Sequence, residues 1–444
     1  MISSKPMISV GLIANAREVR GIFNGSYELP GSIKIQGPFR IASLDGQMVL
    51  FDHEDVEILR SEELRCHSLN EATFTVCDIT IGINFHWERK EQQTFEGDLW
   101  IRSNGDGTCS VINSIDLERY LQSVISSEMS AQASYELLKT HAITSRSWLA
   151  AMLERREKFR NVRNPARHSI ESADEIIRWY DREDHVSFDV CADDHCQRYQ
   201  GITKIISDDV LRAIEETRGI VLVAGNEVCD ARFSKACGGR TELFENCWEE
   251  RSVPYLESIS DSHKEYPPLD HEDGVARWIT SSPDVYCNAT DTALVQHVLP
   301  SFDQETTDFF RWKVEYFADQ LEDILHSKSG IDFGTVTDII PLRRGPSGRI
   351  VTLKIVGIKR SMIVGKELEI RRWLSKSHLY SSAFIVEIDR DATGLPVKFT
   401  FRGAGWGHGV GLCQIGAAVM ASKGFTAEQI VRHYFRGAEL RKLY

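Results

Sequence analysis

The C-terminal part of the chain holds a glycine-rich segment with three side chains suited to ligand binding. Glycine occupies every second position from Gly403 to Gly411, and Trp406, His408 and Gln414 stand within or just after this run. Such a glycine load disfavours helix and ordinary strand, because glycine loses much backbone entropy and has no side chain to pack. We therefore expect turns and close backbone approach, with Trp406, His408 and Gln414 presented on a bare backbone as the floor of a groove. In the alternative interpretation, His408 is a structural hydrogen-bonding residue.

A second group of reactive side chains lies in the middle of the sequence. It consists of His185, Cys191, His195 and Cys196. Zinc favours Cys and His in tetrahedral sites, and a metal would order this charged segment. The sequence predicts a zinc site with these four ligands, which is structural if all four bind the ion. A disulfide between Cys191 and Cys196, or free thiols beside solvated histidines, is the alternative.

Three segments together resemble the SpoIID/LytB family of peptidoglycan-cleaving proteins. They are Leu117–Met129 with Glu136–Trp148, then Phe233–Glu242, then Arg402–Ala417. The segments occur in the family's order, and the resemblance extends over most of residues 95–444. It includes the His/Cys cluster, because some family members bind zinc through two His and two Cys.

The resemblance implies a catalytic role for Glu128. This residue takes the place of the essential Glu in the family's Glu-Met-Pro triplet, which here reads Glu128-Met129-Ser130. A carboxylate at the C-terminal end of a helix faces the negative end of the dipole, which tends to raise its pKa. The implied reaction is lytic transglycosylation between N-acetylmuramic acid and N-acetylglucosamine, with Glu128 as general acid and then base. The alternative is a solvated or ion-paired residue at a helix end.

Other positions of the family motifs imply contacts to the substrate. Trp406 is expected to stack on a sugar, and His408 and Gln414 are expected to hydrogen-bond it. Arg146 is expected to bind a sugar or lactyl carboxylate, to pair with Glu128, or to be a structural arginine. Ser234 and Lys235 are expected to hydrogen-bond the glycan or to stabilise a turn. Gly238 and Gly239 allow the backbone to approach a ligand closely.

Two of the ten cysteines depart from the family pattern. Cys237 stands where the family often has Ser, and Cys413 stands where it usually has a small polar residue, which makes a reactive thiol at Cys413 conceivable. Cys237 and Cys247 are spaced so that they could pair, although spacing alone does not establish a disulfide. Reduced, partly buried thiols are the plainer interpretation.

Apolar periodicity indicates where helices position these residues. Helical spacing is shown by Leu117, Tyr120, Leu121, Val124 and Ile125, and again by Leu138, Ala142, Ser145, Leu149 and Met152. Ser114 or Asp116 is expected to cap the first helix. Further helices are expected at 210–217, at 317–327 and at 426–435, the last with a capping box between Thr426 and Gln429.

Short apolar runs between turn residues indicate strands before residue 112 and again at 219–224, 350–356 and 383–388. We expect an α+β protein with a SpoIID-like catalytic core. Its expected parts are a β-rich part at 1–112, a catalytic-helix core at 113–260 with a charged excursion at 154–200, an inserted smaller α/β segment at 261–382, and a groove segment at 383–444.

The amino-acid composition limits the classes of partner that this protein is expected to bind. With 42% apolar and 26% charged residues the chain is typical of a globular protein, and its net charge of -13 disfavours nucleic acid. No apolar run approaches the roughly 18 residues that span a bilayer, and the first residues show no signal-peptide pattern. The resemblance implies glycan strands as partner, a location outside the cytoplasm and no organic cofactor. Two other functions remain open, a non-catalytic activator of a cell-wall amidase and a zinc-dependent hydrolase that uses the His/Cys cluster with His408.

Overall fold

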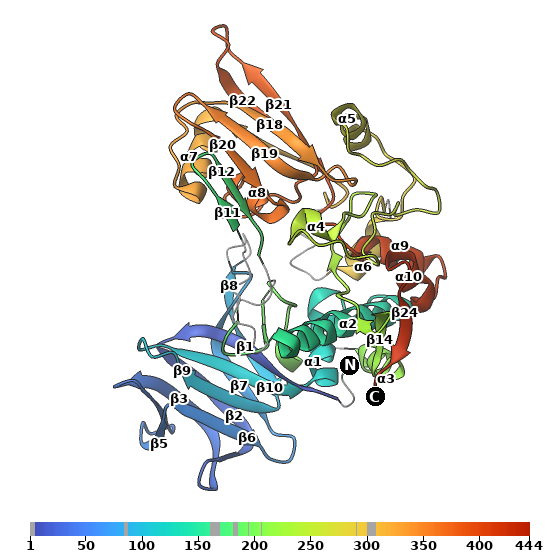
Figure 1. The fold of residues 1–444 in the computed structure, drawn as a ribbon. Helices are drawn as coiled ribbons and strands as arrows, with labels where there is room; N and C mark the ends of the chain where they lie inside the picture. The colour runs from blue at the N-terminus through green and yellow to red at the C-terminus, as the bar shows by residue number, and fades with distance from the viewer. Residues whose placement is uncertain are drawn as a thin grey trace. The chain divides into compact units, whose positions relative to one another are not determined.

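The computed structural model describes residues 5–83, 88–159, 169–180, 185–193, 195–205, 207–289, 291–299 and 308–444. The chain forms two compact units, coloured by residue number in Figure 1. Unit 1 comprises Met1–Glu157, Arg182–Val221 and Lys442–Tyr444, and unit 2 comprises Lys158–Asp181 and Leu222–Arg441. Each unit is described by itself.

Unit 1 is built on a large, mainly antiparallel sheet. Its strands are β1 (Met7–Ala16), β2 (Glu18–Leu29), β3 (Ile33–Leu44), β4 (Gln47–Phe51), β5 (Glu57–Ser61), β6 (Glu63–Ser68), β7 (Thr73–Ile81), β8 (Arg89–Glu96), β9 (Asp98–Ser103), β10 (Cys109–Asp116) and β13 (Val190–Cys191). The strand order is β13-β1-β10-β9-β6-β2-β3-β4-β5, and β7 pairs with β2 and β8. The short strand β13 lies parallel to β1, with Cys191 opposite Gly11, so the sheet edge fixes one residue of the His/Cys cluster.

Helices follow the sheet of unit 1 directly. They are α1 (Leu117–Glu128), α2 (Tyr135–Phe159), the short 3₁₀ helix η2 (Gly201–Lys204) and α3 (Asp208–Glu216). Asp116 caps α1 by accepting a hydrogen bond from the Arg119 N–H at 3.0 Å. Both predicted apolar stripes are buried, which confirms the two helices. The side chains of α1 and α2 are thereby fixed by the core of the unit.

Unit 2 contains two larger sheets and most of the remaining helices. One sheet has the order β11-β12-β20-β19-β18 and the other β17-β22-β21. The strands are β11 (Ser169–Glu171), β12 (Glu175–Arg178), β17 (Arg311–Phe317), β18 (Val336–Arg344), β19 (Ile350–Gly357), β20 (Ser361–Gly365), β21 (Phe384–Arg390) and β22 (Pro396–Ala404). Helices α7 (Ala318–Ser329) and α8 (Glu367–Trp373) contribute to the same apolar core as these sheets, around Trp312 and Trp373 (Figure 1).

Smaller elements of unit 2 carry the sequence motifs. They are β15 (Glu227–Val228), β16 (Phe233–Ser234), α4 (Phe244–Cys247), α5 (Glu272–Thr280), α6 (Thr292–Val298), β23 (Leu412–Cys413), α9 (Gln414–Ser422) and α10 (Ala427–Tyr434). The predicted capping box of α10 is confirmed, because Thr426 and Gln429 exchange hydrogen bonds. Strands β14 (Ile220–Ala224) and β24 (Glu439–Lys442) contain two of the points where the chain passes between the units.

The α+β class is confirmed, while the division of the chain differs from the four expected parts. The segment 113–260 is shared between the units, because 113–157 belong to unit 1 and 222–260 to unit 2. The segment 261–382 is no separate body, since its strand β17 pairs along its whole length with β22 of the last segment. The described residues of 154–200 include regular elements that were not expected, because α2 continues to Phe159 and β12 pairs with β20. Among the described residues, no helix is long and apolar enough to cross a membrane.

Candidate functional sites

Glu128 is the last residue of α1. The next residue, Met129, has extended backbone angles (φ -126°, ψ 160°), so the helix ends there without a proline. Ser130 begins the connection to α2, with its hydroxyl accepting from the Gln132 N–H and its carbonyl from the Ala133 N–H. The Glu128 side chain is 8% exposed, which differs from the alternative of a solvated helix-end residue.

A backbone segment that follows the His/Cys cluster holds Glu128. The Arg198 N–H donates to Oε1 of Glu128 at 2.9 Å, and two residues later the Gln200 N–H donates to the Ser123 hydroxyl at 3.0 Å. Between them, the Tyr199 hydroxyl donates to Oδ1 of Asn113. Arg198 and Gln200 are therefore attached to the helix that carries the carboxylate, and Tyr199 is attached to β10.

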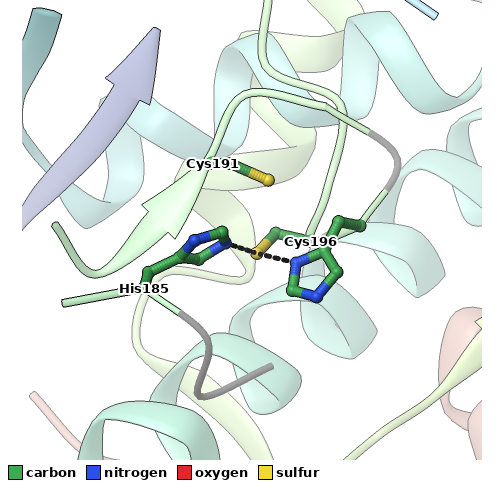
Figure 2. Close-up of side chains that lie close together, drawn as sticks. His185, Cys191 and Cys196 are labelled. Carbon is green, nitrogen blue, oxygen red and sulfur yellow. Dashed lines mark hydrogen bonds between the residues drawn. The ribbon is translucent and has the colours of Figure 1, made fainter. Parts of the chain in front are cut away.

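The four predicted zinc ligands come together in unit 1. Their ligand atoms all lie within 4.8 Å of one another. Sγ of Cys196 lies 3.4 Å from Nε2 of His185 and 3.5 Å from Nδ1 of His195. Figure 2 shows the His185 ring and the thiols of Cys191 and Cys196 close together. All ten cysteines are free, so the structure contains no Cys191–Cys196 disulfide.

The chemistry of this cluster fits a zinc ion. Hydrogen bonds from Cys196, and then from His185 and His195, lower the pKa of the Cys191 thiol against the opposing effect of burial. Thiolate is the form that binds metal, and two thiolates with two imidazoles form a common tetrahedral donor set. The residues present therefore suit zinc, with no further ligand required.

Arg146 lies elsewhere than the sequence suggested. Its guanidinium donates to both carboxylate oxygens of Glu118 at 3.0 and 2.7 Å, and its side chain is 1% exposed. Near the chain's end, the Tyr444 hydroxyl donates to the same carboxylate at 2.7 Å, and the Leu443 N–H donates to the Gly219 carbonyl. The expected pair with Glu128 is wrong. A fully buried guanidinium bound to Glu118 also lacks the exposure that a substrate anchor needs, so the structure favours a structural arginine.

The second and third motifs meet in unit 2. Strands β16 and β23 pair in parallel, which places Ser234 opposite Cys413. Ala236 and Trp406 form a bridge through two backbone hydrogen bonds of 3.1 and 2.7 Å. Gly407 lies directly against Ser234, where an added Cβ would come within 3.1 Å of the serine Cβ. The close approach expected of the glycines thus joins segments more than 170 positions apart in sequence.

The glycan-binding candidates of this region differ in exposure. Trp406 is half-buried and packs against Phe309 and Tyr380, with ring centroids at 4.8 and 4.5 Å. Gln414 is buried at the start of α9, and Lys235 is half-buried. The Ser234 hydroxyl is buried without a hydrogen-bond partner among the described residues, so it offers a polar atom that a ligand would satisfy.

Gly238 and Gly239 both have positive φ, at 83° and 107°, a conformation that favours glycine. An added Cβ on Gly238 would press on Ala404 and Gly405, and one on Gly239 would overlap the Trp278 ring at 2.6 Å. The Gly238 carbonyl also accepts from the indole N–H of Trp278. In this structure the glycine pair approaches protein atoms, and its approach to a ligand remains an expectation.

His408 makes structural contacts within the glycine-rich segment. Its Nδ1 accepts from the Val410 N–H at 3.0 Å, and its ring meets Trp248 edge-on at 4.9 Å. Burial, with help from the cations of Arg232 and Arg349, holds the pKa of His408 well below its usual range. The neutral ring therefore carries its proton on Nε2. This geometry fits the structural interpretation of His408.

Arg349 is a residue of this region that sequence reasoning missed. Its buried guanidinium donates to the Cys237 carbonyl at 3.0 Å and to the Gly407 carbonyl at 3.0 and 3.2 Å. An added Cβ on Gly409 would lie 2.4 Å from the guanidinium carbon. One arginine thus ties both motifs together. A local signal for it is lacking, because its partners lie 58 and 112 positions away.

Cys237 and Cys247 do not form the disulfide that their spacing left open, because both are free thiols. Sγ of Cys247 contacts the His408 carbonyl at 3.7 Å, whereas Sγ of Cys237 lies 3.7 Å from Sγ of Cys287. Burial raises the pKa of the Cys247 thiol well above its usual range, so this residue is an inert core thiol.

Comparison with known proteins defines the class of this chain. Residues 105–223 match the model of the stage II sporulation protein family, SpoIID, which confirms the resemblance seen in the motifs. Glu128 and the His/Cys cluster both lie within the residues that match this model. Residues 242–411 match a domain of unknown function, DUF8618.

Individual relatives agree with this class. The chain is 25% identical over 332 residues to Stage II sporulation protein D of Bacillus amyloliquefaciens, covering 74% of this chain and 75% of the relative. It is likewise 25% identical over 333 residues to Stage II sporulation protein D of Bacillus subtilis, with the same coverage of both chains. It is 23% identical over 248 residues to an amidase enhancer of Bacillus subtilis, covering 52% of this chain and 32% of that protein.

Proposed function

We propose that this protein is a peptidoglycan lytic transglycosylase that acts outside the cytoplasm, with Glu128 as its catalytic residue. The observation that carries the proposal is the placement of this carboxylate at the end of α1, buried and held by the Arg198 N–H. A general acid must be held in a fixed position to protonate a leaving oxygen in the transition state. The relationship to stage II sporulation proteins D supports a cell-wall substrate.

The proposed reaction uses one carboxyl group twice. The Glu128 carboxylic acid gives its proton to the glycosidic oxygen as the bond from C1 of N-acetylmuramic acid to that oxygen breaks. The carboxylate then takes the proton of the muramic 6-hydroxyl as O6 bonds to C1. No water is consumed, the acid form of Glu128 is restored, and the product has a 1,6-anhydro end. A single carboxylate suffices because the substrate supplies the nucleophile.

We further propose that His185, Cys191, His195 and Cys196 hold a structural zinc ion. Four protein ligands would fill a tetrahedral shell and leave no position for a reacting water, which argues against a zinc hydrolase. The ion would supply cross-linking of the segment 185–196. Because Cys196 lies two residues before Arg198, fixing this segment also fixes the donor to Glu128.

For unit 2 we propose that Trp406, Gln414, Ser234 and Lys235 contact sugar groups. The partial exposure of Trp406 and the unsatisfied Ser234 hydroxyl favour this role. Binding of denuded glycan strands to Trp406→Ala and Ser234→Ala tests it, and unchanged affinity in both variants would reject it.

The experiment for the enzymatic proposal is digestion of glycan strands stripped of stem peptides, read by mass spectrometry for anhydro-muramic ends. The wild type is expected to produce them and Glu128→Gln is not. Glu136→Gln is the matched control, because Glu136 is a surface carboxylate at the start of α2 paired with Lys139. Hydrated reducing ends in place of anhydro ends would show a hydrolase instead.

A second function is favoured by the similarity to a protein named amidase enhancer. In this alternative the chain binds glycan and activates a cell-wall amidase without cleaving the strand itself. Stimulation of a purified amidase that persists in Glu128→Gln, together with absence of anhydro ends from the wild type, would support this alternative over the first.

A further inference from the structure

Unit 2 contains a second cluster of metal-binding side chains, apart from the His/Cys cluster of unit 1. Its members are Cys237, Asp261, Cys287 and Cys413, whose ligand atoms all lie within 4.8 Å of one another. All four residues are at most 2% exposed. Cys413 ends β23 and Cys237 follows β16, while Asp261 and Cys287 lie in the loops before and after α5.

We propose that these four residues bind one divalent metal ion of the zinc class through three thiolates and one carboxylate. Sγ of Cys237 and Sγ of Cys287 are 3.7 Å apart. Two thiolates on one tetrahedral zinc, with bonds of about 2.3 Å, lie about 3.8 Å apart. A disulfide would require about 2.05 Å. The sulfur spacing therefore fits an edge of a metal tetrahedron.

Backbone N–H groups point at the sulfur atoms of this cluster. The Cys237 N–H donates to Sγ of Cys413 at 3.2 Å, and the Gly239 N–H donates to Sγ of Cys237 at 3.4 Å. Such donors stabilise thiolates, which are the metal-binding form of cysteine. The positive φ of Gly238 and Gly239 turns the chain so that the Gly239 N–H faces back to Cys237.

Hydrogen bonds to both of its oxygens orient the carboxylate of Asp261. Its Oδ1 accepts from the Tyr434 hydroxyl at 2.6 Å, and its Oδ2 accepts from the Cys287 N–H at 2.8 Å. An added Cβ on Gly416 would lie 2.4 Å from Oδ1, so only glycine in α9 leaves room for the carboxylate. Metal-binding carboxylates typically have such hydrogen-bonded partners.

The charge of the cluster also calls for a cation. Three thiolates and a carboxylate buried together would repel strongly, whereas one divalent ion offsets half of their charge. Arg311 lies nearby, donating to the Gly238 carbonyl at 3.2 Å, and interacts electrostatically with Cys237 and Cys287. A metal ion and Arg311 together would leave one uncompensated negative charge.

The proposed ion would be structural, because four protein ligands close its shell. It would fasten the turn after β16 to the strand that ends in Cys413, and both to the two loops around α5. This metal site is independent of the proposed enzymatic function, since its test reads metal content and not activity.

The test uses the full chain with the first cluster removed by Cys191→Ser/Cys196→Ser. This variant is expected to retain about one equivalent of zinc by mass spectrometry of metals. Cobalt exchanged into it should give a thiolate-to-metal charge-transfer band with tetrahedral d–d absorption. Adding Cys287→Ser should remove most of the metal, whereas adding Cys229→Ser, a buried cysteine of unit 2 outside the cluster, should not.

Two outcomes would overturn the proposal. One is a Cys191→Ser/Cys196→Ser protein that is folded but binds neither zinc nor cobalt. The other is a thiol count on the denatured, chelator-treated wild type two below its ten cysteines, with Cys237 and Cys287 joined in the peptide map. If Cys287→Ser fails to fold, X-ray absorption on the cobalt form decides, because three sulfur neighbours per ion are expected.

Discussion

The backbone N–H of Arg198 donates a 2.9 Å hydrogen bond to Oε1 of Glu128, 70 positions earlier in the chain. The donor belongs to the segment that leaves the His/Cys cluster, and the acceptor ends α1. The main chain thus takes part in positioning the carboxylate. Changes of the Arg198 side chain and of its N–H should therefore have different effects.

Replacing Arg198 by proline removes this N–H and is expected to lower turnover of glycan strands by about ten- to a hundred-fold, since a hydrogen bond to a charged group contributes about 1.5–3 kcal/mol. Arg198→Ala keeps the N–H and should retain most of the activity. Thermal unfolding of both variants identifies any general loss of structure. Equal losses in two well-folded variants would mean that the side chain, and not the N–H, matters.

Glu128→Gln is expected to reduce formation of anhydro ends by at least about 10²-fold, the lower range for loss of a general acid–base group. The amide keeps the shape and can still accept from the Arg198 N–H, so the unfolding temperature should change little. Rates on denuded strands under single-turnover conditions measure the effect. Full activity of a pure Glu128→Gln preparation would show that Glu128 is not the catalytic residue.

Arg146→Ala is expected to destabilise unit 1 by about 3–5 kcal/mol, because it leaves the Glu118 carboxylate buried without its cation. Activity per folded molecule should be unaffected. Arg146→Met with Glu118→Leu, which removes both charges, should recover part of the stability. Urea unfolding followed by circular dichroism measures these changes. A stable Arg146→Ala protein with weakened glycan binding would instead support a substrate contact.

Acidification is expected to destabilise unit 2 through His378. Burial, together with the cations of Arg371, Lys328 and Arg372, lowers the pKa of His378 to about 3. Below about pH 6.5 the unfolded state therefore binds a proton at this histidine that the folded state does not bind. The contribution of His378 to the free energy of unfolding is thus fully present above that pH and is lost as the pH falls toward 3. We expect a loss of about 1–2 kcal/mol between pH 6.5 and 5 from this residue.

His378→Gln should remove that part of the pH dependence in urea unfolding at pH 7 and pH 5. His271→Gln is the control, because His271 is 89% exposed. An unchanged pH slope in His378→Gln would show that other groups govern acid sensitivity.

Gly409→Ala is expected to lower the free energy of unfolding by about 3 kcal/mol or more. The position has φ of 76°, and an added Cβ would overlap the buried Arg349 guanidinium. Gly424→Ala is matched in conformation, with φ of 86°, but its Cβ would meet open space. Gly424→Ala should lower the free energy of unfolding only by the backbone strain, about 1–2 kcal/mol. Similar unfolding midpoints for the two variants would contradict the close packing on Arg349.

The features predictable from sequence were those with a local signal. The stripe from Leu117 to Ile125 and the Thr426–Gln429 capping box are short-range patterns, and the structure confirms both. Individual strands such as β2 and β8 lack a continuous apolar run that would mark their bounds, because exposed residues alternate with their buried ones.

Long-range pairing had no such signal. The contacts of Arg146 with Glu118, of Arg349 with Gly407, and of Cys237 with Cys287 depend on packing of distant segments. For the cluster around Cys237 the sequence held one clue, since Cys237 and Cys413 both depart from the family pattern. These two cysteines lie in separate motifs that meet in the fold. A shared role therefore explains them more readily than two unrelated substitutions would.

The insertion of residues 222–441 between two parts of unit 1 has a consequence for biosynthesis. As the polypeptide leaves the ribosome, every residue of unit 2 emerges before Lys442–Tyr444. Unit 2 can therefore fold first. At that stage the hydrogen bonds of Glu118 with the Tyr444 hydroxyl and of the Gly219 carbonyl with the Leu443 N–H have not yet formed. The unit that carries Glu128 is therefore completed only after all of unit 2 has been translated.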